Sequence, residues 1–407
     1  MPTPEETTKQ DHRDIGQALD LFSFHEIAPG APFWHPKGMI IFKELEKLAR
    51  ETNDKENYLE ISTPILVKKE VFVKSGHWDH YRENMFYFAN PRDKNEVLVI
   101  KPMNCPESTY VYSSQTRSYR DLPLRLAEIG RLNRNELSGT LGGLFRVRQI
   151  TMDDAHIYLA PDQVEKEVVS IINTIKNFYD MFGFETAYVL ATRPKEALGN
   201  KDEWDAAEKA LKNALESAGV KYTIADGEGA FYGPKIEAHL QDSQNRDWQM
   251  GTAQLDLVML PKQFDAFYTD ENGQRKMPWV IHRAIFGSFE RFIGVLLEHT
   301  GGALPLWLSP VQAAILPISD KQNDWAEKVY RELKTEGVRV EINKNNETLG
   351  KKIREAEMQK IPYLLIIGDK EIGAESVAVR KRGKGDIGQM EIKDFLKKIK
   401  EEISFKT

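Results

Sequence analysis

The stretch LRLAEIGRLNRNELSGTLGGLFRVRQITMDD, residues 124–154, carries the densest set of side chains suited to chemistry in this chain. The pattern predicts a strand, a glycine-rich loop and a returning strand, with Arg134, Glu136, Arg146 and Arg148 around the turn. Guanidinium groups on both strands suit a polyphosphate, because their donor forks match phosphate oxygens bidentately. Glu136 beside them could accept a hydrogen bond from the exocyclic amine of a base. A surface hairpin with ion pairs explains the same residues, so the pattern alone leaves both interpretations open.

A second stretch, PWVIHRAIFGSFERFIGVLLEHTGG at 278–302, predicts a strand, a short link and an apolar helix over 284–299. That helix carries Glu290 and Arg291 near its start. An arginine in so apolar a helix needs a buried partner, because an unpaired charge there costs several kcal/mol. A bound phosphate or a structural carboxylate would each serve.

Cys105, in VIKPMNCPES at 99–108, is the only cysteine of the 407 residues. Its neighbours Asn104 and Pro106 predict a turn of the chain. A lone cysteine is commonly a small apolar packing residue. Spacing offers no nearby histidine or cysteine that would mark a metal site, so packing and ligation both stay open.

Bulk composition narrows the class of protein. One cysteine forms no internal disulfide, which predicts a reducing compartment, and we expect a cytoplasmic location. The polar N-terminus shows no signal peptide, and no apolar run reaches the roughly 18 residues that span a bilayer. The net charge of −6 argues mildly against nucleic acid, but the C-terminal quarter is more basic, with RKRGKG at 380–385 as its densest cluster.

The order of elements predicts two domains, residues 1–302 and 303–407, divided near GGALPLWLSP at 301–310. Before this boundary, many strand-like runs adjoin turns, which favours an α+β domain with an antiparallel sheet. Helical patterns flank those runs at 37–52, 162–182, 203–218 and 284–299. After the boundary, strands and helices alternate, which indicates a small α/β domain with a mixed sheet.

Several motifs together resemble a known family. The helix FKELEKLA with a strand ending at Pro64, the RLNRNE loop with FRVR, and FGSFERF resemble the three motifs of class II aminoacyl-tRNA synthetases. More narrowly, KPMNCP, YRDLPLR, DDAHIY, GEGAFYGPKIE, QMGTAQLD and IHRAI resemble threonyl-tRNA synthetases over about residues 11–400. The C-terminal domain is similar to the anticodon-binding domain of that family.

The resemblance implies a threonine–tRNA ligase that uses zinc, ATP and Mg²⁺. It places one zinc ion on Cys105, His156 and His282, a set that leaves a fourth tetrahedral position open for substrate. Threonine would bind that position, with Asp154 accepting from its β-hydroxyl and with Tyr232 and Gln254 nearby. A site built for a hydroxyl rejects valine strongly, whereas serine lacks only a methyl group and should leak through.

The resemblance also assigns the ATP site and a proton-transfer group. Arg134 falls on the α-phosphate position, Glu136 on the adenine amine, and Arg146 and Arg291 on the terminal phosphates. Lys235 and Gln249 align with further residues around the substrates, and His77 aligns with a histidine suspected of proton transfer to or from tRNA.

The expected partner is tRNA(Thr), whose anticodon would meet residues of the C-terminal domain, namely Asn346, Arg354, Lys360, Arg380 and Arg382. A homodimer through the Pro64 region is also implied, and no membrane. Bacterial-type relatives carry N-terminal domains, one of which hydrolyses seryl-tRNA, and this chain begins almost where the catalytic part begins. Whether editing is naturally absent stays open.

Six positions depart from the family pattern, namely Glu107, Ser108, Gly142, Ile150, Met152 and Lys360. Lys360 stands where arginine is usual, which is not a neutral exchange at a bidentate contact. Three alternatives remain: a paralogue that activates threonine for another acceptor, an RNA-binding or regulatory relative without activity, and a sister synthetase of the prolyl or seryl type. The joint set of zinc positions and arginines disfavours the last two.

Overall fold

The computed structural model describes residues 11–242 and 245–406. The described residues form two compact units, one drawn from the ranges 24–32 and 46–295 and one from the ranges 11–23, 33–45 and 296–406. Helices α2 (Pro36–Lys55) and α9 (Phe289–Thr300) each contribute residues to both units. The units follow packing and divide the chain at positions other than 302, so the predicted functional boundary between residues 302 and 303 stays a prediction.

An eight-stranded sheet forms the centre of the larger unit, in the order β10-β9-β11-β12-β15-β8-β7-β3. The five pairings from β9 to β7 are antiparallel, and only β10 with β9 and β3 with β7 are parallel. This confirms the expected antiparallel α+β domain. In sheet order the strands are Tyr222–Ala225, Thr186–Ala191, Lys235–Gln241, Asp247–Asp256, Trp279–Ser288, Gln149–Leu159, Leu124–Asn133 and Leu59–Glu60.

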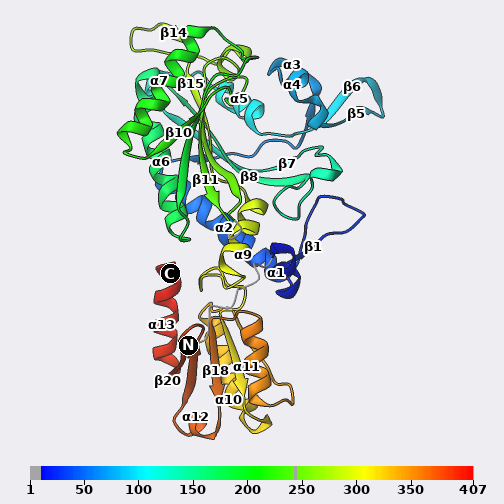
Figure 1. The fold of residues 1–407 in the computed structure, drawn as a ribbon, viewed down its shortest axis with the longest axis vertical. Coiled ribbons are helices and arrows are strands. Elements are labelled where there is room, and N and C mark those ends of the chain that lie inside the picture. The colour runs from blue at the N-terminus through cyan, green and yellow to red at the C-terminus, as the bar shows by residue number, and fades with distance from the viewer. Residues whose placement is uncertain (1–10, 243–244, 407) are drawn as a thin grey trace. The chain divides into compact units, whose positions relative to one another are not determined.

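Helices α6 (Val164–Asp180) and α7 (Lys201–Ser217) cover one face of this sheet, as Figure 1 shows. Helix α6 buries Val168, Ile171, Ile172 and Ile175, a spacing that gathers apolar side chains into one stripe. The stripe packs against β12 and β15. Because strand side chains alternate between faces, every second residue of β8, β12 and β15 points away from these helices. That opposite face carries the site.

Smaller elements border the site face. They are a three-stranded sheet and short helices, with bounds β4 (Leu66–Lys68), β5 (Phe86–Asn90), β6 (Asp93–Ile100), α3 (Lys69–Lys74), α4 (His77–Tyr81), α5 (Cys105–Ser113) and α8 (Leu260–Gln263). A two-stranded ribbon joins β13 (Tyr268–Thr269) to β14 (Arg275–Lys276).

The smaller unit is built on a five-stranded sheet in the order β17-β16-β18-β19-β20. The first three strands are parallel and the last two antiparallel, which confirms the predicted mixed sheet. Its strands are Val340–Ile342, Ala313–Pro317, Tyr363–Ile367, Ser376–Lys381 and Gly385–Glu391, and its helices include α10 (Asn323–Thr335), α11 (Leu349–Met358), α12 (Asp369–Gly373) and α13 (Ile392–Ser404). The N-terminal helix α1 (His12–Ala18) and the ribbon of β1 (Phe22–Ser23) with β2 (Phe33–Trp34) belong to the same unit.

The predicted helix over 284–299 was wrong at its start, because residues 284–288 extend β15 and α9 begins at Phe289. The run is buried on both faces, and a continuous apolar segment of that kind cannot be told from a helix by periodicity. Gly287, with φ of 68°, lies at the change from strand to helix. The returning strand of the hairpin is β8, which begins at Gln149. The sequence patterns predicted neither the helix α5 nor the strand β20.

Candidate active site

Strand register assembles the site from residues that lie far apart in the sequence. Pairing across five strands aligns Lys235, Gln254, His282, His156 and Leu126 in one row. Residues two positions along each strand form a second row on the same face. The members of that row are Glu237, Thr252, Ala284, Asp154 and Glu128.

Cys105, His156 and His282 offer ligand atoms that all lie within 4.8 Å of one another. The thiol comes from the first residue of α5, and the imidazoles come from β8 and β15, with ring centres 5.0 Å apart. Burial lowers the pKa of His156 well below its usual value, so its imidazole is neutral, the form that binds metals. One thiolate and two imidazoles are ligands that zinc prefers.

The surroundings of His282 test whether these residues fit a metal ion. Its Nδ1 is buried and has no hydrogen-bond partner among the described residues, while its Nε2 lies 3.3 Å from Oδ2 of Asp256. A metal-binding histidine commonly presents one ring nitrogen to the metal and the other to a carboxylate. The residues present therefore fit a zinc ion.

Asp256 is a residue that the sequence interpretation missed, although it ends the quoted QMGTAQLD run. Its carboxylate is fully buried and accepts hydrogen bonds from the backbone N–H groups of Val258, Met259 and Leu260 at 2.9, 2.7 and 2.8 Å. These bonds hold the carboxylate in place against His282. Its only sequence signal is its position in the motif.

The residues assigned to threonine gather beside Cys105, His156 and His282, called the metal-ligand group below. The Tyr232 hydroxyl donates to Oε1 of Gln254 at 2.6 Å, and the Tyr232 ring centre is 5.0 Å from that of His282. Asp154 lies two residues before His156 on the same face of β8. Burial raises the pKa of Asp154 to about 6.

A buried ion pair lies beside Asp154 in the sheet. Lys101 Nζ is 2.9 Å from Oε1 of Glu128 and 2.8 Å from the Thr63 hydroxyl, and Glu128 is the cross-strand neighbour of Asp154. Because Lys101 offsets the charge of Glu128, the neighbouring carboxylate of Asp154 faces less repulsion. Composition gave no signal for this pair.

Three arginines converge on a cavity of about 220 Å³ on the site face. Arg291 donates from Nε to the Phe145 carbonyl at 3.0 Å and from Nη1 to the Gln249 carbonyl at 3.2 Å. Burial lowers the pKa of Arg291, and the nearby charges of Arg134 and Arg146 lower it further. Clustered, partly desolvated guanidinium groups favour an anion.

Glu136 and two of the departures also line this cavity. Oε2 of Glu136 accepts from Nε of Arg146 at 2.8 Å. The Arg134 guanidinium donates from Nε to the Pro102 carbonyl at 3.1 Å, which ties the hairpin to the segment before Cys105. Ile150 and Met152 form an apolar part of the wall.

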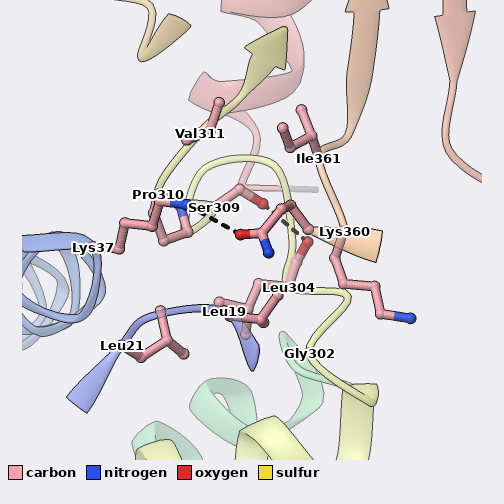
Figure 2. Close-up of a pocket in the computed structure, with 11 residues that line it drawn as sticks. Leu19, Leu21, Lys37, Gly302, Leu304, Ser309, Pro310, Val311, Lys360 and Ile361 are labelled. Atoms are coloured by element: carbon pink, nitrogen blue, oxygen red, sulfur yellow. Dashed lines mark hydrogen bonds between the residues drawn. The ribbon is translucent and has the colours of Figure 1, made fainter. Parts of the chain in front are cut away.

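A cavity in the smaller unit, drawn in Figure 2, has a volume of only about 20 Å³. Leucine, proline, valine and isoleucine side chains form most of its wall, and Lys37 reaches Oε1 of Gln359 at 3.1 Å. That volume holds about one water molecule. The cavity is therefore too small for a substrate, unlike the arginine-lined one.

His77 and Lys235 have neighbours that define their environments. His77 is buried, with Nδ1 at 2.8 Å from the Ser75 hydroxyl, and burial lowers its pKa to about 3, so the ring is neutral. Lys235 Nζ lies 2.5 Å from Oε1 of Glu237. Neither side chain lines the arginine cavity.

Glu107 and Ser108 follow Cys105 in α5 and are both buried. The Ser108 hydroxyl lies 3.0 Å from the Tyr158 hydroxyl. Neither carboxylate oxygen of Glu107 has a hydrogen-bond partner among the described residues, and burial raises its pKa to about 7. A Cβ added to Gly142, another departure, would meet no other atom within 4 Å.

The five residues assigned to RNA differ in exposure. Asn346 and Arg354 are exposed, and Lys360 follows α11 with φ of 56°. Arg380 Nη2 lies 4.0 Å from Oε1 of Glu357. Arg382 instead donates to the backbone carbonyls of Lys360, Ala303 and Leu304, contacts that suit a structural role and leave its RNA contact a prediction.

The fold and the site together define the catalytic core of a class II aminoacyl-tRNA synthetase. Residues 86–300 match the family described as "tRNA synthetase class II core domain (G, H, P, S and T)", and residues 312–402 match the "Anticodon binding domain".

Individual relatives narrow the family. A structure of the RNA-binding domain of threonyl-tRNA synthetase from Cryptosporidium parvum is 40% identical with a TM-score of 0.90, covering 96% of this chain and 98% of that one. The threonine–tRNA ligase of Carboxydothermus hydrogenoformans is 52% identical over 98% of this chain, and that of Clostridium tetani is 49% identical. This chain belongs to the threonyl-tRNA synthetase family.

The chain spans 62% of the length of those two ligases. A prolyl-tRNA synthetase from Cryptosporidium parvum, at 18% identity and a TM-score of 0.75, shares the fold alone. In the described ranges, 11–242 and 245–406, no helix is both long and apolar enough to cross a membrane.

Proposed function

We propose that this chain activates threonine with ATP and transfers it to tRNA(Thr). The single observation that carries the proposal is the position of the Cys105, His156 and His282 group on the same sheet face as the arginine-lined cavity. An amino acid bound at the first would present its carboxylate toward a triphosphate bound at the second.

Threonine selection belongs to the metal-ligand group and Asp154. One zinc ion per chain would be held by Cys105, His156 and His282, and it would supply a Lewis-acid site for the amino and β-hydroxyl groups of threonine. Asp154 accepts a hydrogen bond from the β-hydroxyl, while Tyr232 and Gln254, joined by their hydrogen bond, border the amino acid. Valine offers no hydroxyl and is rejected by a factor of roughly 10⁴ or more.

Adenylation depends on the arginines. The threonine carboxylate attacks the α-phosphorus of ATP, the bond to the bridging oxygen breaks, and pyrophosphate leaves with Mg²⁺. Arg134 neutralises the α-phosphate, and Arg146 and Arg291 bind the leaving phosphates, with Glu136 at the adenine amine. Gln249 and Lys235 border the substrates, and positioning and charge neutralisation carry most of the acceleration.

Transfer to tRNA completes the proposal. The terminal ribose hydroxyl attacks the threonyl carbonyl and AMP leaves, with neutral His77 as a candidate proton acceptor. Asn346, Arg354, Lys360, Arg380 and Arg382 would contact the anticodon side of tRNA. We place the protein in the cytoplasm as a homodimer that contacts itself through the Pro64 region.

The test is threonine-dependent exchange of pyrophosphate into ATP, with metal content measured in parallel. We expect about one zinc per chain, loss of zinc and of exchange in Cys105→Ser, and no change in the control Ser114→Ala, which lies just beyond α5. Absence of threonine dependence in the unmodified protein would refute the proposal. Aminoacylation assays with and without tRNA(Thr) then separate a ligase from a paralogue that uses another acceptor.

A further inference from the structure

Asn104 lies at the N-cap of α5, directly before Cys105, but its side chain does not cap the helix. Asparagine at this position ordinarily accepts a hydrogen bond from a backbone N–H of the first turn. Here the amide points elsewhere, although the residue is fully buried. Helix capping therefore does not account for an asparagine at this position.

The amide is bonded to the carboxylate of Asp154 instead. Asn104 Nδ2 donates to Oδ2 of Asp154 at 2.7 Å, across 50 residues of sequence. Within the described residues this is the one side-chain hydrogen bond of Asp154, so Oδ1 stays available for a ligand. A charge-assisted bond of this length holds the carboxylate in one orientation.

The neighbouring strand leaves space for this arrangement. A Cβ added to Gly130 of β7 would lie 2.3 Å from Oδ1 and 2.4 Å from Nδ2 of Asn104. Oδ1 of Asn104 has no hydrogen-bond partner among the described residues. The Asp154 carboxylate can only accept, so it takes the NH₂ end of the amide, and the carbonyl end lies near Gly130. The absence of a side chain at Gly130 thus leaves the room that the Asn104 amide needs beside Asp154.

We propose that Asn104 is a positioning residue that determines specificity: it orients Asp154 so that Oδ1 accepts from the β-hydroxyl of the bound amino acid. The inference rests on the proposed function, since it takes a hydroxyl-bearing amino acid as the substrate. Asn104 itself touches no reacting atom. Its effect is confined to substrates that carry the hydroxyl.

The proposal predicts a selective loss. Removing a hydrogen bond to a charged group lowers binding by about ten- to hundredfold. In Asn104→Ala we expect the KM for threonine in pyrophosphate exchange to rise by that factor, with the KM for ATP unchanged. The kcat/KM for valine should hardly change, because valine makes no bond to Asp154, so the threonine-to-valine preference falls by about ten- to hundredfold.

Two further variants and a control separate positioning from simple damage. Asn104→Asp keeps the shape but replaces the donor by an acceptor, and Gly130→Ala displaces the amide without touching Asp154; both should reduce the same preference. Asn177→Ala, on the exposed side of α6, should not. Zinc content, measured in each variant, should stay at the level of the unmodified protein.

The outcomes are distinct. Equal losses for threonine and valine, or retention of the preference in Asn104→Ala, would overturn the inference. If the unmodified protein shows no threonine-dependent exchange, the proposed function fails first, and that result is seen before any variant is made. Loss of zinc in Asn104→Ala would instead assign the residue to the metal-ligand group and would also overturn the inference.

Discussion

Glu290 provides a test of how burial affects stability in this fold. It is the second residue of α9 and is 1% exposed, and its two oxygens accept from the backbone N–H of Thr151 at 3.1 and 3.0 Å. Burial raises its pKa from 4.5 to about 7. The change examined is Glu290→Gln, which keeps the shape and one acceptor oxygen but cannot ionise.

The sign follows from linkage between protonation and folding. A carboxyl group whose pKa is higher in the folded than in the unfolded chain stabilises fully below the unfolded value and loses that stabilisation as pH rises through the folded value. The rise from 4.5 to about 7 corresponds to about 3 kcal/mol at 1.36 kcal/mol per pH unit. The unfolding free energy of the unmodified protein should therefore fall relative to Glu290→Gln between pH 5 and pH 8.

The assay is thermal unfolding of both proteins at several pH values, because the difference between them cancels the other titrating groups. At roughly 2 °C per kcal/mol for a unit of this size, Tm of Glu290→Gln should gain roughly 5 °C on the unmodified protein from pH 5 to pH 8, because a small part of the effect is already lost at pH 5. Glu185→Gln, an exposed control in the same unit, should show a constant difference. A flat difference for Glu290→Gln across this range would refute the reasoning.

Three other predictions concern the candidate active site and the smaller unit. Arg291→Lys should lower kcat/KM for ATP in pyrophosphate exchange on the order of 10²-fold, because lysine lacks the planar fork; an unchanged value would remove Arg291 from the phosphate site. Asp256→Asn should weaken zinc binding by about 10- to 100-fold in competition with a chelator; equal affinity would contradict the role of Asp256 beside His282. Arg354→Ala should weaken tRNA binding and reduce its salt dependence by about one phosphate contact without affecting Tm. Arg382→Ala should lower Tm, because it removes the hydrogen bonds to backbone carbonyls. A lower Tm in Arg354→Ala together with an unchanged Tm in Arg382→Ala would contradict both assignments.

Much of the fold follows from local patterns. The helices α2, α6 and α7 lie close to the predicted ranges 37–52, 162–182 and 203–218, because apolar residues at helical spacing need only the neighbouring turns to define a face. The predicted mixed sheet near the C-terminus is also confirmed, because the alternation of short strands and helices is visible in neighbouring residues. The start of α9 was predicted wrongly because burial on both sides of residues 284–288 removes the periodic signal.

For the candidate site too, part was predicted from the sequence and part was decided by the structure. Motifs around Cys105, His156 and His282 predicted these residues as the three ligands, and the structure brings their candidate ligand atoms within 4.8 Å of one another. Spacing in the sequence could not do so, since the residues belong to one helix and two strands that meet only through the sheet register. The roles of Asp154, Arg291 and the other site residues stay proposals.

The sequence by itself determined the family, the order of the elements and the residue types that the chemistry requires, because motifs and periodicity are properties of neighbouring residues. Only the tertiary structure decided that Asn104 turns from its helix to Asp154, that Asp256 stands behind His282, and that Arg382 binds backbone carbonyls. The physical reason is that a hydrogen bond depends on distance and burial. Both are set by strand pairing and helix packing between segments that the sequence does not show to be adjacent.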